Sequence, residues 1–484
     1  MGILSQLQPQ PIWDLFERIC EVPRPSGKEE KIIAMLINFA ETHKLEWKKD
    51  DVGNVLISKP ATAGKENVAP VVLQSHIDMV CEKNSDKLHD FENDPITPVI
   101  NDAWVYADNT TLGADNGLGM AAQMAVLLAD NISHGAIECL FTVTEETGLV
   151  GAKEIKADFF KSHRLINLDS EDDHEIFMGC AGGIDTTAVF AYTKEAPRPG
   201  SFALVLSVTG LKGGHSGGDI HLERGNANKV LARYLWNMKE KFPISLADFD
   251  GGSLRNAIPR EARAVITCQN EHKELLVAEF NHYASELENE YSFSDSGIKL
   301  SISSTELPEF LVDGNTTTNL LNALVACPHG VIAMSTRMEN LVETSTNLAA
   351  VKFIEGNKIQ ITTSQRSEIE SRKMYVRNMV ISIFRMAGAE VANSDGYCGW
   401  TPNPDSELLK VTRSTYEHLF GETPDVHAIH AGLECGLFSA KYPALDMVSF
   451  GPNIRDAHSP KEKAEIKSVG KFWEMLVGVL ENLR

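Results

Sequence analysis

Three short apolar segments place the tightest limit on how this chain can fold. They are PVVLQSHIDMV (70–80), AIECLFTVTEE (136–146) and RLINLDSED (164–172), each apolar almost throughout before it ends in acidic or histidine side chains. Such runs are typical of parallel strands that are covered on both faces. Helical patterns lie between them, so the order of elements indicates a βαβ sheet.

Chain length and a change of pattern predict two domains. At 484 residues the chain is too long for one ordinary core. From about residue 188, segments such as SFALVLSVTG and KIQITTSQR alternate apolar with polar residues, and past about residue 397 helices and buried strands return. We therefore expect an α/β domain from residues 1–187 and 397–484, with a mostly parallel central sheet and helices on both faces. Residues 188–396 would form an inserted α+β domain.

Charge and cysteine usage exclude several classes of partner. The chain has 45 basic and 67 acidic residues, a net charge of -22, whereas nucleic acids and anionic membranes reward clustered Lys and Arg. No apolar stretch reaches the roughly 18 residues of a transmembrane helix, and the N-terminus lacks the pattern of a signal peptide. The eight cysteines are scattered without a Cys-x-x-Cys pair, as in a reduced cytoplasmic protein. We expect neither nucleic acid nor membrane as a partner.

Side chains that can bind metal ions follow the predicted strands at the same structural place. In a parallel sheet the carboxyl ends of the strands open onto one crevice, where these side chains should converge. Taken alone, each has a plainer explanation, because a single Asp or His at a strand end is more often a cap or a surface residue. The set consists of His76, Asp78, Asp115, Glu145, Glu146, Asp169 and His458.

A pair of divalent ions that share one carboxylate fits this set. Such a centre needs a bridging carboxylate, further nitrogen or oxygen ligands on each ion, and room for a shared water. We expect Asp115 to be the bridge. His76 and Asp169 would bind one ion. Glu146 and His458 would bind the other. Imidazole and carboxylate ligands without thiolate suit Zn²⁺ and tolerate Mn²⁺ or Co²⁺.

The adjacent carboxylates of Glu145 and Glu146 take different roles in this interpretation. Of two successive residues that leave a strand, one can bind a metal ion while the other reaches the shared water. Glu146 is then the ligand, and Glu145 is the general base that passes the proton of the water to the leaving amine. Asp78 lies two residues after His76, on the same strand face, where a carboxylate can orient a metal-binding imidazole.

Motifs along the whole chain resemble those of a known family. SHIDMV, GADNGLGMA, TEETGLVGA, NLDSED and DAHSP are similar, in this order, to motifs of the di-zinc metallopeptidases, which include carboxypeptidase G, aminoacylase, carnosinase and peptidase V. FERICEVPRPSGKEEKI, GLKGGHSGGDIH and HAGLECGLF resemble more narrowly the bacterial aminoacyl-histidine dipeptidases. The resemblance implies the metal ligands above, Glu145 as catalytic base and Asp78 as the residue that steers His76. It also implies that the inserted domain is a lid that closes over the substrate.

The resemblance implies functional residues within the lid as well. His215 of GGHSGG would polarise the scissile carbonyl and stabilise its oxyanion, although a glycine-flanked His is otherwise more often a turn residue. Asn256 and Arg366 match positions that hold the substrate backbone and its terminal carboxylate, and a planar guanidinium suits a carboxylate. Glu434 is a speculative partner for a free substrate amine.

The sequence therefore predicts a cytoplasmic, metal-dependent dipeptidase. It would hydrolyse unblocked dipeptides, including Xaa-His dipeptides such as carnosine, by attack of a metal-bridging water that Glu145 activates. An amidohydrolase of N-acyl amino acids on the same site stays open as the alternative. A binding protein without activity is disfavoured because the base and the ligands are all present. Family analogy favours a homodimer, with a monomer also open.

A thiol nucleophile is a weaker interpretation. Cys435 lies near His430 in the sequence, but AGLECG is more typical of a tight backbone turn that lines a pocket.

Overall fold

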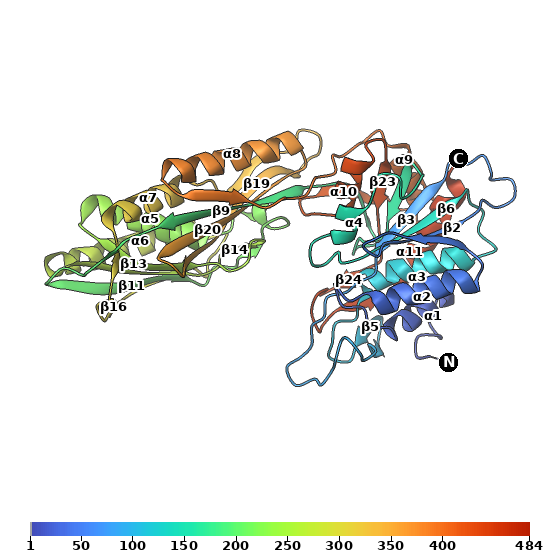
Figure 1. Cartoon of the computed structure of the whole chain (residues 1–484), viewed down its shortest axis with the longest axis horizontal. Coiled ribbons are helices and arrows are strands. Elements are labelled where there is room, and N and C mark those ends of the chain that lie inside the picture. The colour runs from blue at the N-terminus through green and yellow to red at the C-terminus, as the bar shows by residue number, and fades with distance from the viewer. Residues whose placement is uncertain (1) are drawn as a thin grey trace. The chain divides into compact units, whose positions relative to one another are not determined.

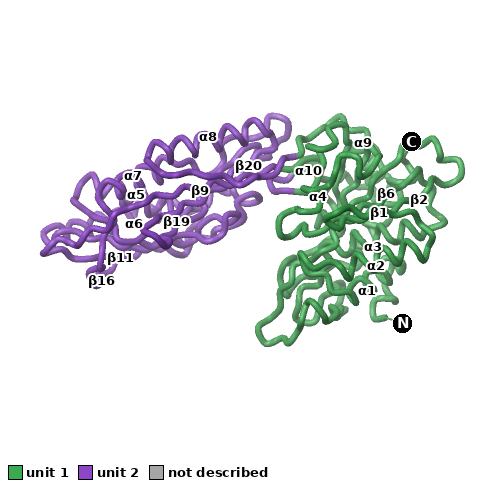
Figure 2. The backbone as a smooth tube through the Cα atoms, viewed as in Figure 1, with its two compact units in different colours: residues 1–180, 400–428, 433–484 green, residues 181–399, 429–432 purple. Residues whose placement is uncertain are grey.

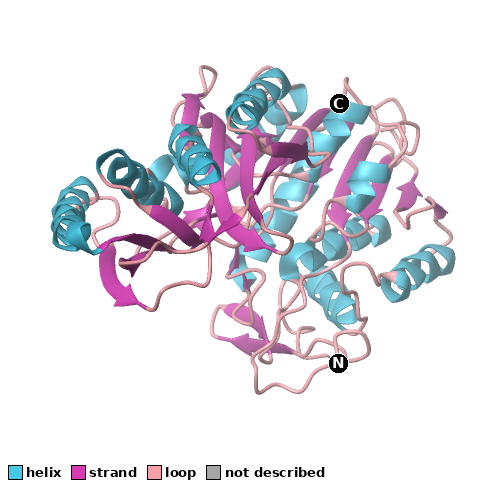
Figure 3. Ribbon diagram, turned by 60° about the vertical axis from the view of Figure 1, so that its left-hand side comes forward, coloured by secondary structure: helices cyan, strands magenta, loops and turns pink. Residues whose placement is uncertain are grey.

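The computed structural model describes residues 2–484, which form two compact units (Figure 2). Unit 1 contains the chain through Cys180, then Trp400–Ala428 and Leu433–Arg484; unit 2 contains Ala181–Gly399 and Ile429–Gly432. Each unit combines helices with a sheet (Figure 3).

Along the chain, the boundaries between the units lie at 180/181 and 399/400, whereas the sequence-based boundaries are at 187/188 and 396/397. Strand β9 (Gly182–Ala191) pairs along its whole length with β20 (Lys358–Ser367), so it belongs entirely to the unit 2 sheet. Its first residues, GGID, carry no apolar alternation that would mark a strand. The lid limits of 188–396 stay a prediction about function.

Unit 1 is built on a mixed sheet with the strand order β1-β2-β6-β3-β7-β23-β8-β22. Strands β2, β6, β3 and β23 of this sheet are labelled in Figure 1. The central strands β6, β3, β7 and β23 are parallel, whereas β1, β2 and β8 join their neighbours antiparallel. All residues of β3 are buried, so both faces of the sheet are covered there. The strands are β1 (Glu46–Lys49), β2 (Val55–Lys59), β3 (Val71–His76), β6 (Ile137–Thr142), β7 (Arg164–Asn167), β8 (Glu175–Cys180), β22 (Asp425–Ile429) and β23 (Asp446–Ser449).

The helices of unit 1 pack against this sheet and one another. Helix α3 contacts β3 and α1, α9 contacts β23 and α11, and α10 contacts β8. Every residue of α3 from Asn116 to Leu127 is buried, as in a helix that is apolar on all sides. The helices are α1 (Gln10–Cys20), α2 (Glu30–Thr42), α3 (Ala114–Leu128), α4 (Val150–Glu154), α9 (Glu407–Phe420), α10 (Glu434–Lys441) and α11 (Ile466–Asn482).

The strand register brings the carboxyl ends of the parallel strands within two residues of one another. His76, the last residue of β3, lies opposite Thr142, the last residue of β6. Asn167 ends β7 and lies opposite both Gln74 and Ser449. A second, small sheet in the order β24-β25-β5-β4 holds the segment after β23. Its strands are β4 (Pro98–Asn101), β5 (Trp104–Ala107), β24 (Ile454–Arg455) and β25 (Lys463–Glu465).

Unit 2 consists of an antiparallel sheet with helices α5, α6, α7 and α8 (Figure 1). Its strand order is β16-β11-β15-β13-β19-β20-β9-β21, with β18 paired to β19. One apolar core joins the four helices to the sheet, around side chains such as Phe249 and Tyr234. The helices are α5 (Ala227–Lys241), α6 (Lys273–Glu290), α7 (Gly314–Ala326) and α8 (Glu370–Met386). The main strands are β11 (Ser201–Thr209), β13 (Ser245–Gly251), β15 (Ala262–Gln269), β16 (Lys299–Thr305), β18 (Gly330–Met334), β19 (Val342–Ile354) and β21 (Glu390–Asn393).

Within residues 2–484, helix length and apolarity never reach what a bilayer crossing requires. None of the eight cysteines is paired in a disulfide in this part of the chain.

We expect substitution of Leu73 in β3 to destabilise unit 1 strongly. Leu73 is 0% exposed, so Leu73→Ala leaves a cavity and should lower the free energy of unfolding by about 2–5 kcal/mol. Leu88→Ala is the matched control, because Leu88 is 95% exposed and a surface change typically stays within about 0.5 kcal/mol. Urea unfolding of both variants measures the difference, and equal losses would contradict the assignment of β3 to the core.

Candidate metal centre

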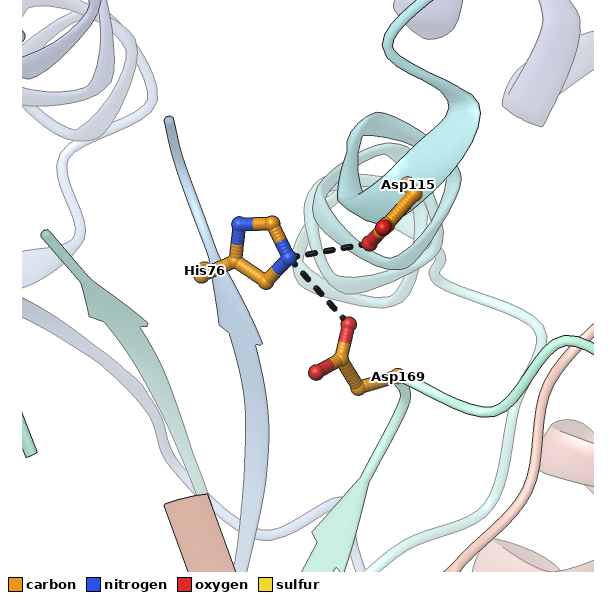
Figure 4. Close-up of side chains that lie close together, drawn as sticks. All are labelled: His76, Asp115 and Asp169. Atoms are coloured by element: carbon orange, nitrogen blue, oxygen red, sulfur yellow. Dashed lines mark hydrogen bonds and ion pairs between the residues drawn. The ribbon is translucent and has the colours of Figure 1, made fainter. Parts of the chain in front are cut away.

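The end of β3 brings His76 together with Asp115 and Asp169 (Figure 4). His76 Nε2 lies 2.9 Å from Asp115 Oδ1 and 3.3 Å from Asp169 Oδ1. Asp115 comes from the first turn of α3, and Asp169 follows the end of β7. Asn116 donates a hydrogen bond to Asp169 Oδ1 and so helps to hold that carboxylate.

The second oxygen of Asp115 belongs to another group, formed with Glu146 and His458. His458 Nε2 lies 3.1 Å from Asp115 Oδ2 and 3.0 Å from Glu146 Oε1. His458 has a φ of 61°, a left-handed conformation that is uncommon outside glycine and tends to gather at functional sites. One carboxylate therefore turns its two oxygens to two separate groups of candidate ligands.

The donor atoms fit divalent ions. Tetrahedral ions with ligand distances of about 2.0–2.2 Å place neighbouring ligand atoms about 3.3–3.6 Å apart. In the structure the histidine nitrogens and carboxylate oxygens of the two groups lie 2.9–3.3 Å apart, at or below the short end of that range, so the groups would open slightly around ions. A bridging carboxylate with imidazole and carboxylate on each side is also the donor chemistry of a dinuclear site.

Buried charge dominates the electrostatics of this cluster. Burial raises the pKa of the carboxyl groups of Glu145, Glu146 and Asp169, and their neighbouring carboxylates add to the effect. Hydrogen bonds to Asp115 and Glu146 raise the pKa of His458 to about 11. Burial opposes ionisation of Asp115 too, but hydrogen bonds from both histidines bring its pKa below the usual range. Positive charge among the carboxylates therefore stabilises their ionised forms.

Asp78 fixes the turn that carries the two glutamates. Its Oδ1 accepts a hydrogen bond from the backbone N–H of Glu145 (2.9 Å), and its Oδ2 accepts one from that of Glu146 (3.2 Å). Ser26 donates to the same Oδ2 at 2.7 Å, and Asp78 Oδ1 lies 3.4 Å from Nδ1 of His76. Asp78 thus links the orientation of the His76 ring to the position of the glutamate turn.

The two glutamates differ in their neighbours. Glu146 pairs with His458, whereas Glu145 and Glu146 both lie close enough to His76 to form a third candidate group. Proximity alone therefore allows either carboxylate to approach an ion, and the contact with His458 is what singles out Glu146.

A row of buried polar side chains joins the ends of the central strands by hydrogen bonds. Gln74 Nε2 donates to Glu434 Oε2 (2.6 Å), and Thr142 Oγ1 donates to the same oxygen (2.9 Å). Asn167 Nδ2 donates to Gln74 Oε1 (2.6 Å), and Ser449 Oγ donates to Asn167 Oδ1 (2.5 Å). The row crosses the central strands and ties their ends together.

Glu434 itself is completely buried, and burial raises its pKa to about 8. Its Oε1 has no hydrogen-bond partner among residues 2–484.

In unit 2 the predicted residues His215 and Asn256 lie on adjoining segments. Strand β12 (Gly214–His215) pairs with β14 (Ala257–Ile258), and Ser216 N–H donates to the carbonyl of Asn256 at 2.8 Å.

His215 Nδ1 accepts hydrogen bonds from the backbone N–H groups of Gly217 (3.3 Å) and Gly218 (3.1 Å). An imidazole nitrogen that accepts carries no proton, so in the neutral ring the proton is on Nε2. Burial and the charge of Arg366 lower the pKa of His215, which favours this neutral ring.

The glycines of GGHSGG follow from this loop geometry. A Cβ on Gly217 would lie 2.3 Å from the carbonyl oxygen of His430, and Gly214 has a φ of 142°. A side chain at either position would displace the loop that presents His215.

Arg366 is buried in β20 with one polar atom unused. Its Nη1 donates to Tyr397 Oη at 2.9 Å, while its Nε has no hydrogen-bond partner in the described chain. His430, from the short segment of unit 2 between two parts of unit 1, contacts Ser345 Oγ through Nε2 at 2.7 Å. Burial and the charge of Arg366 lower the pKa of His430 to about 3.

Sequence reasoning missed the grouping of Arg366 with Tyr397 and His430. Tyr397 lies in a loop without a motif. His430 begins the motif HAGLECGLF, but sequence reasoning considered it only as a neighbour of Cys435. Burial raises the pKa of the Cys435 thiol well above its usual value, which disfavours a thiolate nucleophile.

Comparisons with known proteins find one family model and relatives that match nearly the whole chain. The model of peptidase family M20/M25/M40 matches residues 72–482. A cytosol non-specific dipeptidase from Escherichia coli is 45% identical over 483 residues, which cover 100% of this chain and 99% of that protein. The crystal structure of aminoacylhistidine dipeptidase from Vibrio alginolyticus has a TM-score of 0.92 and 43% identity, covering 100% of this chain and 98% of that one. A tripeptidase from Staphylococcus aureus, at 17% identity and a TM-score of 0.58 over 98% of both chains, shares the fold.

We expect the His215 ring to be neutral, with its proton on Nε2, near pH 7. The two glycine N–H groups occupy Nδ1, so ¹⁵N NMR spectra of histidine-labelled protein should show a protonated Nε2 and an unprotonated Nδ1. A His215→Asn sample identifies the signal. Protonation of both nitrogens at neutral pH would contradict the assignment.

Proposed function

The chain belongs to peptidase family M20/M25/M40, and from that premise we propose that it is a metal-dependent dipeptidase acting on unblocked dipeptides, including Xaa-His. Two relatives that match nearly the whole chain support this proposal, since one is named a non-specific dipeptidase and the other an aminoacylhistidine dipeptidase. The observation that carries it is the placement of Asp115, whose two oxygens each face a different histidine.

Two divalent ions would be held by five side chains. Asp115 would bridge, with His76 and Asp169 on one side. Glu146 and His458 would complete the other side. Zn²⁺ suits these ligands best, and Mn²⁺ or Co²⁺ also fits. When bound, the ions supply a polarised water nucleophile and a Lewis acid for the scissile carbonyl.

Glu145 would move the proton during hydrolysis. The water oxygen forms a bond to the carbonyl carbon, and Glu145 takes the released proton. As the carbon–nitrogen bond breaks, Glu145 returns this proton to the leaving amine. The hydrogen bond from its backbone N–H to Asp78 holds the turn that positions it.

Unit 2 would supply residues that bind the peptide. His215 would donate a hydrogen bond from Nε2 to the carbonyl oxygen and stabilise its negative charge. Asn256 would hold the substrate backbone. Arg366 would bind the terminal carboxylate, and its Nε, which lacks a partner in the described chain, is a donor available for that contact.

Glu434 is the proposed partner of the free substrate amine. An ammonium group is the kind of donor that its Oε1 lacks among the described residues. Its complete burial means that the substrate would have to reach an interior atom. Glu434→Gln removes the negative charge and should raise KM for unblocked dipeptides.

The E. coli relative is named for the cytosol, and we propose the cytoplasm for this chain. A homodimer, with a monomer as the alternative, stays a prediction that the mass in solution tests.

We predict two divalent ions per chain and activity on dipeptides that depends on them. Metal analysis before and after chelation should accompany assays with alanyl-histidine, carnosine and N-acetyl-histidine. Chelation should abolish hydrolysis, and Zn²⁺, Mn²⁺ or Co²⁺ should restore it. Full activity of metal-free protein would overturn the proposal, and faster turnover of N-acetyl-histidine than of alanyl-histidine would favour an amidohydrolase.

We predict that the adjacent glutamates respond differently to substitution. Glu145→Ala should keep both ions but lose about 10²–10⁴-fold in kcat, the range for a missing general acid–base group. Glu146→Ala should lose metal, so its defect should shrink as the metal concentration rises. Metal content and kcat of each variant separate the roles, and metal loss in Glu145→Ala alone would reverse them.

A further inference from the structure

One buried carboxylate, that of Glu462, holds the loop that carries Asp115. Its Oε2 accepts hydrogen bonds from the backbone N–H groups of Leu112 (2.8 Å) and Gly113 (3.0 Å). Its Oε1 accepts those of Ala114 (2.8 Å) and Asp115 (3.3 Å). Successive N–H groups that converge in this way form a concavity suited to an anion. Here the anion is a side chain of the protein itself.

A buried cation, the guanidinium of Arg24, joins the same loop to the end of β3. Its Nη1 donates to the carbonyl oxygens of Ile77 (3.0 Å) and Asp78 (2.8 Å), and its Nη2 donates to that of Gly113. A Cβ on Gly113 would lie 2.5 Å from Nη2, and a Cβ on Gly117 would lie 2.7 Å from the same atom. Both glycines of the GADNG motif therefore leave room for Arg24.

We propose that Arg24 and Glu462 are positioning residues that shape the metal centre before any ion binds. This inference rests on the proposed function, because it takes His76, Asp115 and His458 as ligands. Arg24 fixes the strand end that carries His76, and both residues fix the loop that carries Asp115. Glu462 also belongs to the segment that carries His458, which β25 fastens to β5. Three ligand-bearing segments are thus joined without use of the ligand side chains.

Repulsion among the carboxylates of the centre explains why such anchors are needed. The carboxylates of the centre repel one another when no cation lies among them, which favours spreading of the segments in metal-free protein. Glu462 and Arg24 carry opposite charges, so together they add no net charge to this crowded edge. Both are buried and hydrogen-bonded at several atoms, which is the condition under which buried charges are tolerated.

Glu462→Gln tests the role of the carboxylate. The variant keeps the size of the side chain but turns an N–H donor toward backbone N–H groups, so the loop at residues 112–115 should loosen. We expect Zn²⁺ to bind on the order of 10–100-fold more weakly to the chelated and refilled protein, the range for lost outer partners of metal ligands. In metal-free samples, the amides of residues 112–115 should exchange hydrogen faster in the variant than in the wild type.

Asp446→Asn is the matched control. Asp446 is also a carboxylate of unit 1 that accepts hydrogen bonds, from Ser406 Oγ and from Leu408 N–H (3.0 Å), but it lies at the opposite end of β23. This variant should lower the melting temperature without changing Zn²⁺ affinity. If Glu462→Gln does the same, and binds Zn²⁺ like the wild type below its melting temperature, the residue is only structural and the inference is wrong.

Arg24→Lys provides a second test that does not depend on folding of the first variant. It keeps the charge but cannot reproduce the forked contacts with three carbonyl groups, so Zn²⁺ affinity should also fall. Unchanged affinity in folded Arg24→Lys protein would overturn the inference. A wild-type chain that binds no divalent ion would overturn the proposed function instead, while hydrogen exchange at residues 112–115 would still report on the anchor.

Discussion

Ionised carboxylates that share a buried edge repel one another unless positive charge lies among them, and the arrangement of unit 1 depends on this constraint. Asp115, Glu146 and Asp169 each lie within about hydrogen-bond distance of a histidine nitrogen. Without ions, protonated histidines are the available positive charge, as the raised pKa of His458 indicates. Divalent ions would supply the same positive charge, so the proposed function accounts for a cluster of buried carboxylates.

The sheet makes this concentration of charge achievable. The four parallel strands end close together: the register pairs His76 with Thr142 at the ends of β3 and β6, and Asn167 with Ser449 at the ends of β7 and β23. The polar row beneath them is hydrogen-bonded from strand to strand, so the strand ends cannot slide independently. Arg24 and Glu462 extend this rigidity from the strands to the loops that carry the remaining candidate ligands.

The sequence predicted the fold of unit 1 better than the start of unit 2, for a physical reason. The α/β fold with an inserted domain is confirmed, because runs such as VVLQSH reveal buried parallel strands directly, and the whole chain superposes on a dipeptidase of the same family. The start of unit 2 differed from the sequence-based boundary because Gly182 and Gly183 give β9 no apolar signal. The hydrogen bond between Arg366 and Tyr397 joins two segments of unit 2 that no local sequence pattern links.

The sequence by itself predicted the buried strands of unit 1 and the gathering of candidate ligands at their carboxyl ends, because continuous apolar runs and the side chains that follow them are local properties. Only the tertiary structure decided which oxygen of Asp115 faces which histidine, and which nitrogen of His215 is occupied. It alone also revealed Arg24 and Glu462, which are 438 positions apart in the chain and meet at one loop. The physical reason is that hydrogen bonds between distant segments depend on how the chain packs, and no local pattern records that packing.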